Sequence, residues 1–250
     1  MFDHAAFCRR LSQQPTHRQS IIKDAAIERL FDRLSFIKNI PKTIYVEGYQ
    51  PEIFWQHLTS LYPEAQIMQS LQQPVDLILS NFYIHQVQHI PTQLNHFYTN
   101  LNPGGWLMFI TFGSSSLSTW QKAWRSLDGC PHHNALIDTP QWGDLLVEHK
   151  FETPVVDAQM LYLTYEQPKT MIQDLRQLNE PLADTKMRHT LTGKNRWHKL
   201  VCKMGKPLQL EFEFVFGYGI RPKNLTTKHQ DNQPAKIELN QLKAHLKQQS

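Results

Sequence analysis

Two continuous apolar runs in the middle of the chain constrain its fold most, because they have the form of buried parallel strands. Residues 75–79 are apolar except for Asp76, and residues 106–112 form a second run after a Pro-Gly-Gly turn at residues 103–105. Strands of a parallel sheet are covered on both faces, and each parallel pair needs a long crossover connection. Residues 92–101 lie between the runs and have room for the crossover helix. The two runs therefore predict neighbouring parallel strands.

The remaining segments continue this alternation of strand and helix. A helix is predicted at residues 20–34, where apolar side chains recur at spacings of three and four. In residues 208–216 apolar and polar side chains alternate, so Leu208, Leu210, Phe212, Phe214 and Phe216 share one face of a strand. The other predicted elements are strands at 43–46, 67–68 and 161–165, and helices at 51–61, 117–127, 141–148 and 168–178. This order is typical of an open α/β sheet that ends in an antiparallel strand.

Length and composition favour one main domain. A chain of 250 residues that is 40% hydrophobic and 19% charged can bury one sizeable core. We expect an N-terminal helical cap at residues 1–40, the main domain at 41–222 and a polar tail at 223–250, in which residues 237–246 have the spacing of a short surface helix. No apolar stretch is long enough for a membrane span and the N-terminus does not resemble a signal peptide, so we expect a soluble, cytoplasmic protein.

Cysteine, histidine and charge patterns exclude some classes of site. The three cysteines form no C-x-x-C pair, and the 13 histidines include no H-E-x-x-H motif, so neither a metal site nor a disulfide framework is expected. A net charge of +4 is too mild to indicate nucleic-acid binding. Residues 185–210 nevertheless contain no acidic residue and seven basic ones, which we call the basic surface: Lys186, Arg188, Lys194, Arg196, Lys199, Lys203 and Lys206. Such a stretch either steers an acidic partner or is simply a solvated face.

Motifs in both halves of the chain resemble one family of enzymes. Residues 76–82, the turn at 101–105 and residues 109–112 resemble the fourth and fifth strands of class I S-adenosylmethionine methyltransferases. Downstream motifs resemble, in order, the malonyl-acyl-carrier-protein O-methyltransferases of biotin synthesis and their relatives among respiratory complex I assembly factors: residues 131–132, 137–138, 142–146, 150–151, 154–157, 163–165, 174–176, 191–194 and 216–222. Residues 2–6 and 18–19 are similar to the N-terminal helix of that family, so the resemblance covers most of residues 2–222.

The resemblance implies a Rossmann-like sheet that binds S-adenosylmethionine at the turn after the first strand. The family has an acid and three glycines there, and the missing side chains let the backbone approach the cofactor. Here Val46 replaces the acid, Gly48 keeps the first glycine, and Gln50 and Glu52 replace the other two. Glu47 takes the place of the acid if the register slips by one residue, and is otherwise a solvated turn carboxylate.

The adenosine side of the implied site departs further from the family. The acid that binds the ribose hydroxyls falls near Gln69, an amide without charge. Only residues 70–74 then separate this position from the next strand, and a crossover connection needs about ten to twelve residues. The third strand of the family, at the sheet edge, is therefore predicted to be missing. An edge strand can be lost without opening the core.

The remaining implied site residues concern the methyl acceptor. Ser80 and Asn81 end the fourth strand of the family, where the methionine end of the cofactor meets the acceptor, although a helix cap is an equal alternative. Arg9 or Arg10 falls at a family tyrosine and could pair with a malonyl carboxylate, or is simply exposed. Within the basic surface, Lys194 and Arg196 would bind the acidic helix of an acyl carrier protein.

Three functions remain open at this point. The first is methyl transfer to malonyl-acyl carrier protein, for which no catalytic residue is assigned because a carboxylate acceptor is already ionised at neutral pH. The second is a catalytically inactive protein of the same fold that serves as a binding, regulatory or assembly partner, since two glycines, the ribose acid and the edge strand are missing. An assembly factor for a respiratory subunit is a third possibility.

Overall fold

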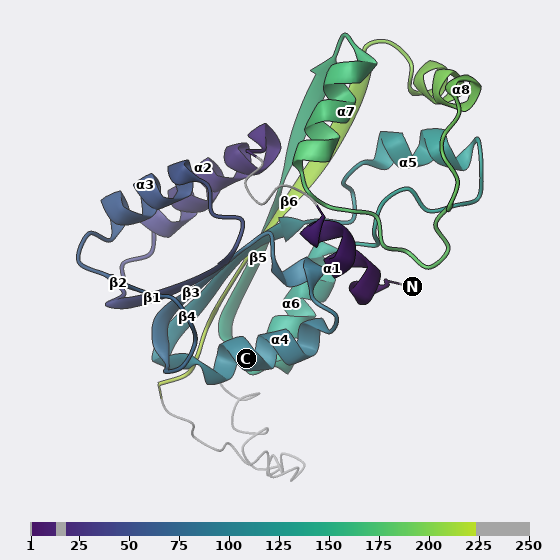
Figure 1. The fold of residues 1–250 in the computed structure, drawn as a ribbon. Coiled ribbons are helices and arrows are strands. Elements are labelled where there is room, and N and C mark those ends of the chain that lie inside the picture. Colours follow the sequence, from purple (N-terminus) through teal and green to yellow (C-terminus); the bar gives the residue numbers. More distant parts are fainter. Residues whose placement is uncertain (1, 14–18, 224–250) are drawn as a thin grey trace, which may run out of the picture.

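A six-stranded mixed sheet forms the centre of the molecule. The computed structural model describes residues 2–13 and 19–223. The strands lie in the order β2-β1-β3-β4-β6-β5, and β1 to β4 are parallel while β6 runs antiparallel to both β4 and β5 (Figure 1). The bounds are β1 Thr43–Gly48, β2 Gln66–Met68, β3 Val75–Asn81, β4 Leu101–Phe112, β5 Glu152–Tyr165 and β6 Leu208–Ile220. The predicted α/β sheet with an antiparallel strand near its end is confirmed.

Helices cover both faces of this sheet. One face packs against α2 (Ile21–Ser35), α3 (Glu52–Leu61), α5 (Ser118–Arg125), α7 (Pro168–Gln177) and α8 (Lys194–Met204). The other face packs against α4 (Ile90–Thr99), α6 (Thr139–Glu148) and the short helix η1 (Ile84–Gln86). Side chains at alternate positions of β4 enter the two cores, and the five predicted residues of β6 all enter the first. Among the described residues no helix is both long and apolar enough to cross a bilayer.

The Asp76 carboxylate links the beginnings of the three central strands, β1, β3 and β4. Its carboxylate accepts hydrogen bonds from the backbone N–H groups of Lys42 and Thr43, at 2.9 and 3.1 Å, and from the side chain of Asn102 at 2.8 Å. Partial burial opposes ionisation, but these hydrogen bonds outweigh it and lower the pKa of Asp76. The one polar residue in the apolar run thus fixes β1, β3 and β4 relative to one another.

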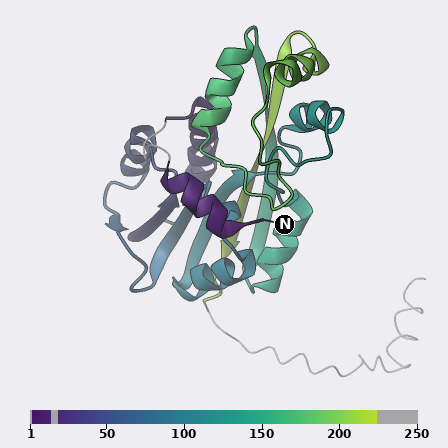
Figure 2. The ribbon, with the colours of Figure 1, turned by 45° about the vertical axis from the view of Figure 1, so that its right-hand side comes forward.

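The far ends of β5 and β6 extend beyond the rest of the sheet. Pairing between β4 and β6 ends at Phe112 and Phe214, whereas β5 and β6 remain paired as far as Tyr165 and Leu208. Helices α5, α7 and α8 pack around this extension (Figures 1 and 2). We call the extension and these three helices the arm. The first helix, α1 (His4–Ser12), lies near its base, where the N–H of Asp3 donates to the carbonyl of Ala183.

Some boundaries differ from the prediction. Strand β5 begins at Glu152 rather than at residue 161. Its first nine residues lie at the sheet edge and none of them is buried, so they form no apolar run from which a strand could be predicted. Strand β4 begins at Leu101, and an irregularity in its pairing with β3 accommodates the glycine turn. Helix α8 was not predicted, since only Leu200 and Met204 of it are buried. Residues 69–74 contain neither helix nor strand, as expected from their number. The helix predicted in the tail lies outside the described residues.

Candidate functional site

The carboxyl ends of β1 and β3 bring four of the predicted cofactor residues together. Glu47 and Gly48 lie opposite Ser80 and Asn81 in the strand register. Gly48 has a φ of +97°, and a Cβ atom there would lie 2.1 Å from the carbonyl oxygen of Asn81. The next residue, Tyr49, donates its N–H to the same oxygen at 2.7 Å. The turn is therefore tight, and only glycine fits at Gly48.

Two hydrogen-bond acceptors at this turn lack partners among the described residues. The side-chain oxygens of Ser80 and Asn81 are buried and accept no hydrogen bond there. Glu47 is half-buried, and burial raises its pKa while hydrogen bonds from Tyr83 and Tyr45 oppose that shift. Buried acceptors without partners are costly, and a ligand with N–H donors would satisfy them.

The other predicted residues around the turn are less favourably placed. Gln50 donates from its side-chain nitrogen to the carbonyl of Val46 at 3.0 Å, so it folds back over the turn. Glu52 is the first residue of α3, and Gln69 is exposed immediately after β2. The structure thus places side chains at two positions where the family has glycine.

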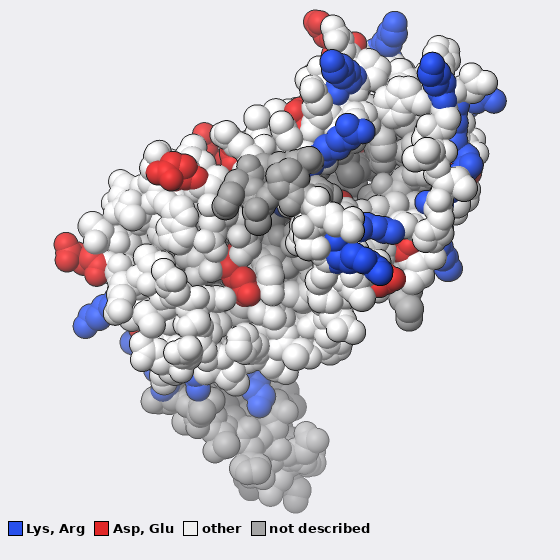
Figure 3. All heavy atoms as spheres, in the orientation of Figure 1, with Lys and Arg blue, Asp and Glu red and all other residues white. Residues whose placement is uncertain are grey.

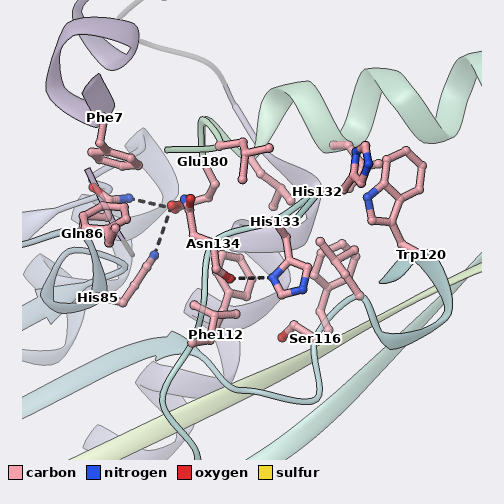
Figure 4. A pocket seen from close by; sticks show the side chains of 17 residues that line it. Phe7, His85, Gln86, Phe112, Ser116, Trp120, His132, His133, Asn134 and Glu180 are labelled. Atoms are coloured by element: carbon pink, nitrogen blue, oxygen red, sulfur yellow. Dashed lines mark hydrogen bonds and ion pairs between the residues drawn. The ribbon is translucent and has the colours of Figure 1, made fainter. Parts of the chain in front are cut away.

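A buried polar cluster lies beside the turn. Glu180, in the connection between α7 and α8, accepts from Lys23 of α2 at 2.7 Å. It also accepts from Gln86 of η1 at 2.8 Å and lies 3.2 Å from Nε2 of His85 (Figure 4). The Lys23 and Glu180 side chains are only 4% and 16% exposed. Burial alone would raise the pKa of Glu180, but Lys23 and His85 outweigh burial and lower it to about 2. Nδ1 of His85 lies 2.8 Å from the Thr111 hydroxyl, so both ring nitrogens have partners.

This cluster forms one wall of a cavity of about 170 Å³, which we call the inner cavity. His85, Gln86 and Glu180 line it together with His133, Asn134 and mainly apolar side chains, including Phe7, Phe112 and Trp120 (Figure 4). It lies at the carboxyl ends of β3 and β4, where ligands of open α/β sheets bind.

A larger depression of about 720 Å³, the outer groove, lies on the arm. It is lined by α5, α7 and α8 and shares Trp120, His132 and Leu175 with the inner cavity. Lys and Arg side chains predominate over the arm (Figure 3). Lys194 is exposed at the start of α8, whereas Arg196 forms an ion pair with Asp128, which also binds His132. The outer groove therefore lies under a basic exterior and shares part of its wall with the inner cavity.

The two arginines predicted on α1 have different surroundings. Arg9 is exposed. The guanidinium of Arg10 donates to the carbonyl of Leu182, a residue of the cavity wall, and to Sδ of Met187. Arg10 thus lies near the inner cavity but already has partners.

Sequence reasoning missed Lys23, Gln86 and Glu180. One signal was available, because Lys23 precedes Ile27, Leu30 and Leu34 at helical spacing and so belongs to the buried stripe of α2. A lysine in such a stripe needs a buried partner. Nothing in the sequence identifies that partner, since Glu180 is 157 residues away. Among the described residues no cluster of His, Cys, Asp or Glu could hold a metal ion.

Comparison with known proteins identifies the family. A family described as "Methyltransferase domain" matches residues 15–153 of the chain, more than half of it. The chain belongs to this family. It is 32% identical to the malonyl-[acyl-carrier protein] O-methyltransferase of Xylella fastidiosa over 58% of this chain and 49% of that protein, so the match spans about half of the relative. It is 28% identical to the Legionella pneumophila protein of the same name, over 76% of this chain and 80% of that one.

A solved structure agrees on the fold. A candidate methyltransferase from Bacillus halodurans superimposes with a TM-score of 0.50 at 10% identity, covering 78% of this chain and 98% of that one. At such low identity the likeness concerns the arrangement of helices and strands alone.

The family implies S-adenosylmethionine as cofactor, and the residues present fit one end of it. Gly48 provides a glycine turn, Asn81 provides an acceptor without a partner among the described residues, and Glu47 provides a carboxylate, which together suit the ammonium group of the methionine end. The adenosine end has no comparable residues, because Gln69 is an exposed amide and no helix or strand follows β2 before β3.

Proposed function

We propose that this chain is an S-adenosylmethionine-dependent O-methyltransferase that acts on the free carboxylate of malonyl-acyl carrier protein. Relatives that align over most of their length carry that activity in their names. The observation that carries the proposal is the outer groove, which lies under a basic exterior and shares three side chains with a small cavity at the carboxyl ends of β3 and β4. A carrier protein with an acidic surface would dock on the basic surface, and its acyl group would enter the cavity.

The chain itself needs only to bind and orient the reactants. When bound, the cofactor supplies a methyl group on a sulfonium ion. Gly48 and Asn81 would hold its methionine end, and Glu47 would bind its ammonium group. The malonyl carboxylate is an ionised nucleophile at neutral pH, so no side chain must remove a proton. The apolar walls of the inner cavity exclude water, and fixed geometry supplies most of the acceleration of such a displacement.

A second candidate is a member of the family that binds a carrier protein without transferring a methyl group. Gln50, Glu52 and Gln69 favour it, as does the direct passage from β2 to β3, which corresponds to loss of the third strand of the family. In both candidates the carrier protein is the partner, and they differ only in the cofactor.

Cofactor binding separates the two candidates. We would titrate the purified protein with S-adenosylmethionine and S-adenosylhomocysteine by calorimetry, then assay methyl transfer to malonyl-acyl carrier protein. Micromolar or submillimolar binding with formation of the methyl ester supports the enzyme. Carrier binding without any cofactor binding at millimolar concentration supports the second candidate. Absence of binding in a calorimetric titration with malonyl-acyl carrier protein, together with absence of the methyl ester, would refute the proposal of a carrier-protein partner.

A further inference from the structure

Three nitrogen donors converge on the carboxylate of Glu180. The Lys23 ammonium and the Gln86 amide contact Oε1 at 2.7 and 2.8 Å, and the His85 ring nitrogen lies 3.2 Å from Oε2. The donors come from α2 and η1, whereas Glu180 comes from the distant connection between α7 and α8. The body of the domain thus supplies a site for a carboxylate, and a side chain from the connection between α7 and α8 occupies it.

The location of this site suits an acyl acceptor. Glu180, His85 and Gln86 line the inner cavity, and Lys23 lies behind Glu180 rather than in the cavity wall. The Lys23 nitrogen is 5.3 Å from the ring centre of Phe82 and 5.5 Å from that of Tyr49, the residues that directly follow the ends of β3 and β1. A carboxylate in the position of Glu180 would therefore lie beside the glycine turn.

Other cations near the cavity are already engaged by the chain. Arg10 donates to a backbone carbonyl and to Met187, and Arg196 is paired with Asp128. A carboxylate that takes the place of Glu180 would have Lys23 as its buried cation. A volume of about 170 Å³ is below the roughly 300 Å³ at which ligand pockets usually begin, so the cavity suits a short acyl group.

We propose that Lys23, His85 and Gln86 form the binding site for the free carboxylate of the acyl acceptor, and that Glu180 occupies this site while the acceptor is absent. The incoming carboxylate displaces the Glu180 side chain and then contacts the same three donors. The identity of the acceptor rests on the proposed function, whereas the carboxylate site itself does not.

Rescue by a small carboxylate tests the site. The variant Glu180→Ala removes the internal carboxylate and leaves the donors in place. We would compare its thermal unfolding in 100 mM sodium acetate, 100 mM sodium malonate and sodium chloride at matched ionic strength. Acetate should raise the melting temperature of Glu180→Ala by about 3 °C or more relative to chloride. The wild type and the control Glu166→Ala, which removes an exposed carboxylate, should shift by less than about 1 °C.

A double variant tests whether the acetate effect depends on the Lys23 donor. In Lys23→Met combined with Glu180→Ala, the acetate effect should disappear. An equal acetate shift in both variants, or none in Glu180→Ala, would overturn the proposal. If Glu180→Ala does not fold in chloride, we would refold it from urea in acetate and in chloride. Recovery of the folded state in acetate supports the carboxylate site, whereas failure in both salts contradicts it. The assay contains neither cofactor nor carrier protein, so its outcome is independent of whether the chain transfers methyl groups.

Discussion

Replacing Lys23 by methionine should reveal how strongly the polar cluster stabilises the fold. The Lys23 ammonium lies 2.7 Å from Glu180, and the two side chains are 4% and 16% exposed. Removing one partner of a buried ion pair leaves the other charge uncompensated, which costs about 3–5 kcal/mol. Lys23→Met keeps most of the apolar volume, so the loss of charge dominates. We expect the free energy of unfolding at pH 7.5 to fall by that amount.

The pH dependence of this loss has a defined sign. In the wild type the pKa of Glu180 is lowered to about 2 from its usual 4.5, so its contribution of about 3 kcal/mol is present above pH 4.5 and is lost as the pH falls towards 2. Without Lys23 the buried carboxylate is unfavourable, and a proton taken up by Glu180 relieves it. The cost of Lys23→Met should therefore shrink by at least about 1 kcal/mol between pH 7.5 and pH 5.

Urea unfolding followed by circular dichroism measures both quantities. The wild type, Lys23→Met and the control Lys38→Met would be unfolded at pH 7.5, 6 and 5. Lys38 is exposed just after α2, so its replacement should change the free energy of unfolding by no more than about 0.5 kcal/mol. A loss below about 1 kcal/mol for Lys23→Met at pH 7.5, or one that grows on acidification, would refute this account of the cluster.

Three further perturbations address the turn, the adenosine side and the basic surface. Gly48→Ala puts a Cβ atom 2.1 Å from a carbonyl oxygen and should lower the free energy of unfolding by at least about 2 kcal/mol, whereas Gly129→Ala, with open space around it, should not. Gln69→Asp should strengthen S-adenosylmethionine binding about threefold to tenfold in calorimetry by supplying a charged acceptor after β2, and exposed Gln72→Asp serves as control. Lys194→Glu should weaken carrier-protein binding at low salt by at least about threefold and reduce its salt dependence, with the circular dichroism spectrum unchanged.

The sheet could be predicted because buried strands have a recognisable pattern of apolar residues in the sequence. Residues 75–79 and 106–112 are covered on both faces, so their continuous apolar runs identified β3 and β4. The first half of β5 lies at the sheet edge with mostly exposed side chains, so its sequence contains no apolar run that would predict a strand. Helix α8 has two buried residues among eleven, too few for a visible stripe.

The candidate site was predictable only where it follows from local chain geometry. A glycine after the first strand and polar residues at the end of β3 must meet in a parallel sheet, and Gly48 and Asn81 do. The Lys23–Glu180 pair joins α2 to a loop 157 residues later, and no periodicity relates them. Burial of Lys23 could be inferred from the stripe of α2, but its partner required the tertiary structure.

The cofactor decides between the two candidate functions, and the expected affinity can be bounded. A hydrogen bond to a charged group contributes about 1.5–3 kcal/mol and a neutral one about 0.5–1.5 kcal/mol, so an amide in place of the ribose carboxylate should weaken S-adenosylmethionine binding about fivefold to tenfold relative to a family member that has the acid. The methionine end retains Gly48 and the acceptors of Glu47 and Asn81. Under the proposed function such a site would bind its cofactor weakly, and the chain would act as an enzyme only where the cofactor concentration reaches the raised KM. Measurements of carrier-protein or carboxylate binding cannot replace the measurement of cofactor affinity, because both candidate functions require the carboxylate site and the outer groove.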